Sequence, residues 1–269
     1  MRRVAVVGHV EWVDFIPVPH HPRSGEVVHA YGCFTRAAGG GGVVAVVLAE
    51  LGAEVDFFCA LGDDIHGQTA ADQLQSRGVR IHTAWRQEPT RRAVTLLEGH
   101  RERTIVTIGK RLDPLASDAL PWERLERADG VYFTAGDSEA LRRARAARVL
   151  VASPRARTAL SQAGPDIDAL VFSGLDPDEQ EWASRVDARA RLVVRTEGAA
   201  GGSWWGSGGA PGGRWSAVEP PGEVRDSYGC GDSFAAGFTF ALAGGASPDE
   251  AAAVGAVCGA RCLTRAGAP

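Results

Sequence analysis

The segment Asp226-Ser227-Tyr228-Gly229-Cys230-Gly231-Asp232 carries the strongest structural signal in this chain. Its small residues directly precede an alanine-rich apolar run, which is typical of a loop that enters a helix. A helix start leaves backbone N–H groups unpaired and carries partial positive charge, so such a loop suits an anion. A bound anion repels a neighbouring carboxylate, so the carboxylate of Asp232 at this position indicates a chemical role. We therefore expect Asp232 to take a proton from an attacking hydroxyl while the loop amides hold a phosphoryl group.

This segment resembles the C-terminal signature of the ribokinase-like (PfkB) carbohydrate kinases, in which an Asp-Thr/Ser-x-Gly-small-Gly-Asp loop forms the anion hole. Both aspartates, the serine and both glycines of the segment match. The resemblance implies that Asp232 is the catalytic base and that the amides of Gly229, Cys230 and Gly231 bind the migrating phosphate. It is not a Walker-type loop, because no Gly-Lys-Ser/Thr follows the glycines.

The length and composition of the chain narrow its class. Its 269 residues suffice for one large core with a small appendage, and its net charge of −4 comes from interspersed acids and bases. This balance argues against nucleic-acid and membrane-surface partners, and no apolar run is long enough to span a bilayer. Five scattered cysteines without zinc spacing indicate a reducing compartment, so we expect a cytoplasmic location.

Valine-rich apolar runs alternate with helical patterns along the chain. Continuous apolar strands alternating with helices predict an α/β fold with a parallel sheet covered on both faces. The predicted strands are Val4–Val7, Val55–Cys59, Gly130–Phe133, Val149–Ala152, Ala169–Phe172 and Leu192–Arg195. The predicted helices are Val43–Leu51, Gly67–Arg77, Ser138–Arg148, Arg155–Ala163 and Pro177–Ser184.

Two more polar stretches, about 11–36 and 88–108, interrupt this alternation. They contain strand-like pieces at Val27–Tyr31, Ala93–Glu98 and Thr104–Thr107, with a turn at Gly99-His100-Arg101. The resemblance implies that both stretches form a small β-sheet lid over the substrate; from composition alone, surface hairpins fit as well. We thus expect one ribokinase-like kinase domain over 1–269, a three-layer sandwich with a mostly parallel central sheet. The family also forms homodimers through the lid.

The acceptor site is expected near the first strand and the first helix. The glycines of Gly39-Gly40-Gly41-Gly42 let a sugar ring lie against backbone, because no Cβ intervenes. The resemblance assigns Gly39 and Gly40 to the substrate, together with Asp14, whose carboxylate accepts from hydroxyls; a capping or solvated Asp14 is the alternative. It also places an asparagine that contacts a substrate hydroxyl at position 43. This chain has Val43 there, which cannot form a hydrogen bond.

The resemblance also places the nucleotide. Thr196 and Gly198 follow a predicted strand and would face the phosphates, although a simple strand-end turn also fits. Asp226 belongs to the same set. In the C-terminal helix, the small residues at Gly255 and Cys258 would flank a flat adenine.

The acidic residues of the chain give only weak evidence of a metal site. Asp176-x-x-Glu179 resembles a motif that holds the magnesium shell through water, with Glu179 as the acid, but the motif's asparagine is absent. A helix cap by these acids is the alternative. Asp63-Asp64 is interpreted as a turn and a helix cap. The expected cofactors are ATP and Mg²⁺, and some relatives bind a monovalent cation near Asp226.

The sequence therefore predicts a phosphotransferase that moves the γ-phosphoryl group of ATP to a hydroxyl of a small sugar-like molecule. Val43 and Trp12 leave a nucleoside kinase open, because an apolar residue favours a flatter acceptor. A non-catalytic nucleotide-binding member of the fold is a further alternative, although binding alone does not need Asp232.

Overall fold

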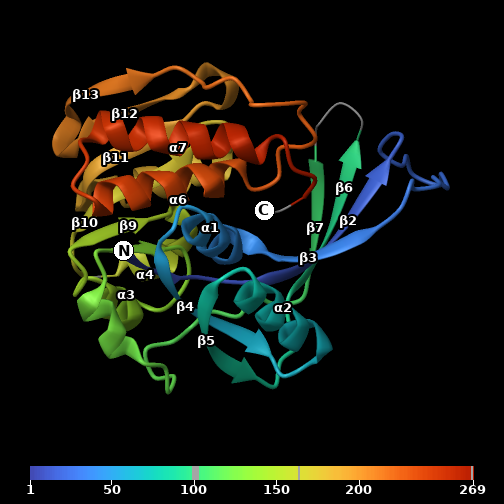
Figure 1. The fold of residues 1–269 in the computed structure, drawn as a ribbon, viewed down its shortest axis with the longest axis horizontal. Helices are drawn as coiled ribbons and strands as arrows, with labels where there is room; N and C mark the ends of the chain where they lie inside the picture. Colours follow the sequence, from blue (N-terminus) through green and yellow to red (C-terminus); the bar gives the residue numbers. More distant parts are fainter. Residues whose placement is uncertain (99–102, 163, 268) are drawn as a thin grey trace.

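A nine-stranded sheet forms the centre of the protein in the computed structural model, which describes residues 1–98, 103–162, 164–267 and 269 (Figure 1). Its strand order is β13-β12-β11-β10-β9-β8-β1-β4-β5. All neighbours are parallel except β11–β12 and β12–β13. The strands are β1 (Arg3–Val7), β4 (Glu54–Gly62), β5 (Val79–Arg86), β8 (Gly130–Phe133), β9 (Val149–Ala152), β10 (Ile167–Ser173), β11 (Ala190–Thr196), β12 (Gly202–Gly206) and β13 (Ala210–Trp215).

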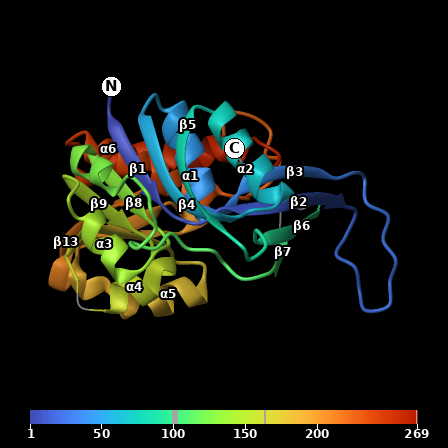
Figure 2. The same ribbon diagram turned by 90° about the horizontal axis from the view of Figure 1, so that it is seen from below.

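Helices cover both faces of this sheet (Figure 2). One face carries α1 (Gly39–Glu50), α2 (Ile65–Ser76), α6 (Cys230–Ala243) and α7 (Pro248–Cys262), and the other carries α3 (Ser138–Ala144), α4 (Arg157–Ser161) and α5 (Pro177–Ser184). The buried residues divide accordingly, because strand side chains alternate between faces. Val4 and Val6 join the first layer and Ala5 and Val7 the second. The continuous apolar strands are thus explained by burial on both sides.

A second, four-stranded sheet forms the lid, in the order β3-β2-β6-β7. Its strands are β2 (Glu11–Val18), β3 (Phe34–Ala38), β6 (Arg92–Glu98) and β7 (Arg103–Ile108). The pair β2–β6 is parallel, while β2–β3 and β6–β7 are antiparallel. The lid projects to one side of the helical layers (Figure 1).

The expected fold class is confirmed, with local differences. Val27–Tyr31 is not a strand but an exposed irregular segment, and the lid's second strand lies later, at Phe34–Ala38. The expected turn at 99–101 falls outside the described residues. The third helix ends at Ala144, before its predicted end at Arg148. Within the described part of the chain, every helix is too short or too polar to cross a membrane.

Candidate active site

The signature loop meets α6 at a left-handed residue. Gly229, the N-cap of α6, has φ +74°, a conformation that favours glycine, and no side chain caps the helix. The amides of Gly229 and Gly231 have no acceptor among the described residues, and that of Cys230 reaches Ser227 O only at 3.4 Å. These N–H groups and the helix dipole therefore form a site for an anion.

Asp226 holds this loop from within. It is buried, and its two carboxylate oxygens accept from Tyr228 N at 2.8 Å and Gly267 N at 2.6 Å. Burial raises the pKa of Asp226, while these hydrogen bonds oppose the shift. From the lid, Arg103 donates to Ser227 Oγ at 2.7 Å. Asp226 is thus placed as a brace of the loop.

Asp232 lies in the first turn of α6, half-buried, and faces the start of α1. A Cβ built on Gly40 would lie 3.3 Å from Asp232 Oδ1, 3.5 Å from Thr134 Oγ1 and 3.5 Å from His9 Cε1. Burial raises the pKa of Asp232, the charge of Arg155 opposes the rise and that of Glu179 adds to it. The structure thus brings Gly40, predicted from sequence, against the predicted base.

His9 and Glu11 complete this cluster. Gly40 N donates to His9 Nε2 at 3.4 Å, which leaves Nδ1 to carry the proton of the neutral ring. His9 Nδ1 and Thr134 Oγ1 are buried without a hydrogen-bond partner among the described residues. Burial, together with nearby arginines, lowers the pKa of His9 well below 6.5, so the ring is neutral. Glu11 is buried, and its Oε1 lies 3.8 Å from His9 Nε2 and 2.9 Å from Arg91 Nε, with which it forms an ion pair. Burial raises the pKa of Glu11.

The structure does not bring Asp14 to this cluster. Along β2, Phe15 packs edge-on against Tyr228 of the signature loop, whereas Trp12 stacks on His66 of α2. Because strand residues alternate, Asp14 shares the face of Trp12. Its carboxylate is bound by Arg92 at 2.7 Å.

Val43 lies beside the signature loop. It is buried in the core, and its Cγ1 would lie 3.2 Å from a Cβ built on Gly229. It therefore packs α1 against the signature loop. Gly39 has φ +80°, and a Cβ there would lie 3.2 Å from His9 Cδ2, so Gly39 lets the chain pass close to His9.

Arg155 and Glu179 form an ion pair beside Asp232. Arg155 follows β9 in the short 3-10 turn Pro154–Ala156, and its Nε donates to Glu179 Oε1 at 2.6 Å. The other oxygen of Glu179 accepts from Ser173 N at 2.8 Å. Asp176 caps α5 through the amides of Asp178 and Glu179, as the capping interpretation expected.

The predicted nucleotide residues are spread over two regions. Thr196 ends β11, and its hydroxyl donates to Phe172 O at 3.3 Å; Gly198 follows in a turn with φ +58°. Gly255 and Cys258 pack α7 onto α6: Cβ atoms built at Gly255 and Gly237 would lie 2.9 Å from Phe234 and 2.7 Å from Cys258 Sγ.

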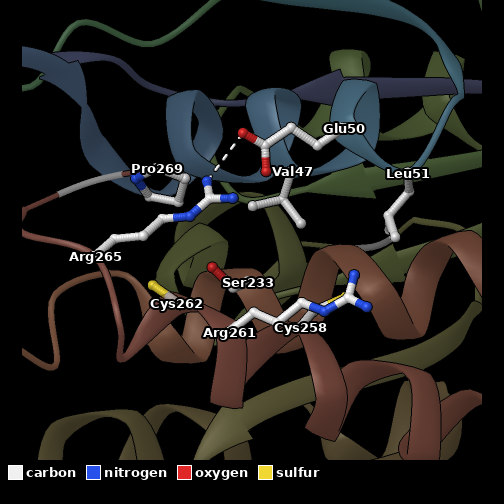
Figure 3. A pocket seen from close by; sticks show the side chains of 9 residues that line it. All are labelled: Val47, Glu50, Leu51, Ser233, Cys258, Arg261, Cys262, Arg265 and Pro269. Atoms are coloured by element: carbon white, nitrogen blue, oxygen red, sulfur yellow. Dashed lines mark hydrogen bonds and ion pairs between the residues drawn. The ribbon is translucent and has the colours of Figure 1, made fainter. Parts of the chain in front are cut away.

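A small pocket lies between α1, α6 and α7. Cys258 lines it with Ser233 and Pro269, and the ion pair of Arg265 with Glu50, 2.9 Å long, spans it (Figure 3). This ion pair connects the C-terminal segment to α1.

Sequence reasoning assigned no site role to His9, Glu11, Thr134 or Arg155. Each follows the carboxyl end of a parallel strand, namely β1, β8 or β9. In open α/β sheets these ends meet at one edge, where ligands bind. Position after a predicted strand was therefore the available signal. Asp64, by contrast, caps α2 by accepting from Gly67 N, as predicted.

Comparison with known proteins gives a consistent result. The pfkB family carbohydrate kinase profile matches residues 1–158 and 165–269. An acarbose 7(IV)-phosphotransferase of Actinoplanes sp. is 44% identical over 84 residues, which is 30% of this chain and 28% of that protein. A microbiome-derived acarbose kinase superposes with a TM-score of 0.79 at 26% identity, covering 99% of this chain and 94% of that one.

Ribokinase structures share the fold along the whole chain. Arabidopsis thaliana ribokinase, solved with ribose and ATP, has a TM-score of 0.76 at 21% identity and covers 100% of this chain and 95% of that one. The family profile thus covers nearly all residues of a chain that has this fold. The chain therefore belongs to the pfkB family of carbohydrate kinases.

Proposed function

We propose that this carbohydrate kinase transfers the γ-phosphoryl group of ATP to a hydroxyl of a sugar-like molecule, with Asp232 as the general base. The observation that carries the proposal is the position of Asp232. It lies beside the unpaired amides of Gly229 and Gly231 and, on its other side, faces Gly40. A hydroxyl near Gly40 could pass its proton to Asp232 while the amides hold the phosphoryl group. Burial raises the pKa of Asp232, which makes it a better base.

The acceptor would lie over Gly39 and Gly40. The Nδ1–H of neutral His9 and the hydroxyl of Thr134 are buried and lack partners among the described residues, so both are available to acceptor oxygens. The carboxylate of Glu11 adds an acceptor of hydrogen bonds. In this proposal these three side chains would take the substrate-binding role that sequence reasoning gave to Asp14.

The phosphates would lie along the amides of Gly229, Cys230 and Gly231. The turn at Gly198 and the end of β11 at Thr196 also lie at the carboxyl edge of the sheet, which supports a nucleotide running from there towards α6. Asp226 would act by holding the loop, and Gly255 and Cys258 by fixing α7.

Magnesium is expected with ATP, but the chain's acids fit it poorly. Both oxygens of Glu179 already have protein partners, and Asp176 caps α5. Among the described residues no three His, Cys, Asp or Glu side chains gather as a metal site. Mg²⁺ is often held mainly by substrate phosphates and waters. A monovalent cation near Asp226 remains a prediction.

Two proposals concern the protein's surroundings. A homodimer through the lid is supported by β7, the outer strand of the lid sheet, whose six residues are all exposed. An edge strand of this kind offers unpaired backbone groups to a second chain. A cytoplasmic location is supported by five cysteines without a disulfide.

The nucleoside-kinase alternative has less support than the sugar kinase. It rested on Val43 and Trp12, yet both are buried, and Trp12 stacks on His66. The non-catalytic alternative is addressed by experiment.

The test is an ADP-release screen of the purified protein with Mg–ATP against sugars, sugar acids, polyols, nucleosides and acarbose, which two similar proteins are named for. Acceptor-dependent ADP release that Asp232→Asn abolishes would support the proposal. ATP binding without turnover above the Asp232→Asn background across the panel would favour the non-catalytic alternative.

A further inference from the structure

The guanidinium of Arg155 is held at Nε, while its two terminal nitrogens are available to a ligand. Its Nε is bound by Glu179, whose carboxylate is buried and fixed by Ser173 N. Its backbone N–H donates to Ser153 Oγ at 3.2 Å, which fixes the start of the turn. Yet 45% of the side chain is exposed, and its two terminal nitrogens have no partner among the described residues.

Arg155 lies on the same edge of the sheet as the groups around Asp232, because it follows β9, and the neighbouring strand β8 ends just before Thr134. Burial raises the pKa of Asp232 and of Glu11, and the charge of Arg155 opposes both shifts; at His9, burial lowers the pKa and Arg155 lowers it further. Arg111 donates to Arg155 O at 3.3 Å, so a second guanidinium lies close by. The guanidinium of Arg155 is thus a fixed cation near Asp232 and Glu11, and its terminal N–H groups are available as hydrogen-bond donors.

Two other arginines of this protein, Arg86 and Arg157, are held differently. Both terminal nitrogens of Arg86 bind the carboxylate of Asp118 at 2.7 Å. Arg157, two residues after Arg155, lies over the ring of Trp182 at 4.0 Å. A guanidinium that only neutralised Glu179 could use its planar fork in the same bidentate way. Arg155 uses Nε alone and leaves the fork open.

We propose that the two terminal nitrogens of Arg155 bind an oxyanion beside Asp232. This inference rests on the proposed function, because it assigns the oxyanion to one of the two reactants. The oxyanion is either the γ-phosphoryl group of ATP or an acidic group of the acceptor; a guanidinium fork matches both phosphate and carboxylate. Glu179 then acts as a positioning residue that orients a guanidinium.

The experiment compares Arg155→Gln with Arg157→Gln, a matched change two residues away. Calorimetry measures the affinity of the full chain for Mg–AMP-PNP and Mg–ADP. If Arg155 binds the γ-phosphoryl group, Arg155→Gln weakens AMP-PNP binding by about tenfold or more and leaves ADP within about twofold. Arg157→Gln changes neither affinity. Arg155→Lys, which keeps the charge without the fork, falls between wild type and Arg155→Gln.

The acceptor arm uses gluconate and the neutral sorbitol, titrated into the ADP complex. Preferential binding of gluconate that Arg155→Gln abolishes assigns the oxyanion to the acceptor. If AMP-PNP and gluconate both bind Arg155→Gln as they bind Arg157→Gln, the inference is overturned. Because these titrations need no turnover, a wild type that transfers nothing would refute the kinase reaction without deciding the role of Arg155.

Discussion

The Cα of Gly40 directly faces the carboxylate of Asp232: a Cβ at position 40 would lie 3.3 Å from Oδ1. This space is where an acceptor hydroxyl must come to meet the base. Gly40→Ala should therefore lower acceptor kcat/KM by about tenfold or more. It should not lower Tm, because alanine favours a helix over glycine by up to about 1 kcal/mol.

Gly42→Ala is the matched control for this change. It lies in the same helix, and its Cβ would meet only Leu74 Cδ2, at 4.0 Å. We expect a similar or higher Tm with unchanged kcat/KM. Equal kinetics in the two variants would show that acceptors do not approach over Gly40.

Asp232→Asn should lower kcat by about 10²–10⁴-fold, because an amide cannot accept the acceptor's proton. Nucleotide binding should survive, since the loop amides are backbone groups. Steady-state kinetics with calorimetry of Mg–ADP measures both. A variant that kept more than about a tenth of wild-type kcat would exclude Asp232 as the base.

The pH profile of kcat/KM should fall on the acid side as Asp232 takes up a proton. Burial raises the pKa of Asp232, so the fall begins above the ordinary value of 3.8. His9 should add no step near its ordinary pKa of 6.5, because burial and nearby arginines keep it neutral. A limb centred at 6.5 that His9→Gln removed would contradict this assignment.

The central sheet was predictable because its strands are buried on both faces and therefore read as continuous apolar runs. Gly130–Phe133 and Val149–Ala152 were predicted with the bounds that the structure has. β5 was missed, since it is an edge strand, Val79–Arg86, whose partly exposed residues dilute the apolar signal. Val27–Tyr31 looked like a strand by composition, but its one backbone hydrogen bond to the described part of the lid sheet, from Tyr31 N to Pro17 O, does not extend into a strand.

The site was less predictable than the fold. The signature loop can be recognised in the sequence by its glycines, because only glycine easily adopts the positive φ of Gly229. Asp14 shows why side-chain positions in the lid were hard to predict: a shift of one residue along a strand moves a side chain to the opposite face of the sheet. Glu11 and Asp14 lie on opposite faces of β2, and only the tertiary contacts of Trp12 and Phe15 reveal which face meets the signature loop. The pairing of Arg155 with Glu179 joins residues 24 apart and has no local pattern.

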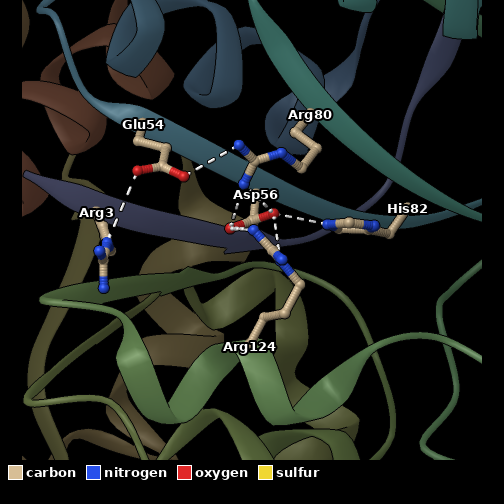
Figure 4. A network of polar contacts seen from close by, with 6 residues as sticks. All are labelled: Arg3, Glu54, Asp56, Arg80, His82 and Arg124. Carbon is tan, nitrogen blue, oxygen red and sulfur yellow. Dashed lines mark hydrogen bonds and ion pairs between the residues drawn. The ribbon is translucent and has the colours of Figure 1, made fainter.

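A polar network lies at the opposite, amino edge of the sheet (Figure 4). Asp56 of β4 accepts from His82 at 2.7 Å and from Arg124 Nε at 2.8 Å, and it pairs with Arg80. Burial would raise the pKa of Asp56, but these hydrogen bonds and charges outweigh it and lower the pKa well below 3.8. The network thus ties two strands to the 3-10 turn Trp122–Arg127.

Asp56→Asn should reduce the free energy of unfolding by about 1–3 kcal/mol while kcat stays within about twofold, because the network lies far along the sheet from Asp232. Since the folded pKa of Asp56 lies below the unfolded one, its contribution is complete above about pH 4 and is lost as pH falls below it. Urea denaturation of wild type and Asp56→Asn between pH 3 and 7 measures this. The two stabilities should differ most at neutral pH and converge towards pH 3, although the wild type keeps some advantage there because its folded pKa is lower still. A difference that stayed constant over this range would mean that the ionised carboxylate of Asp56 does not stabilise the fold.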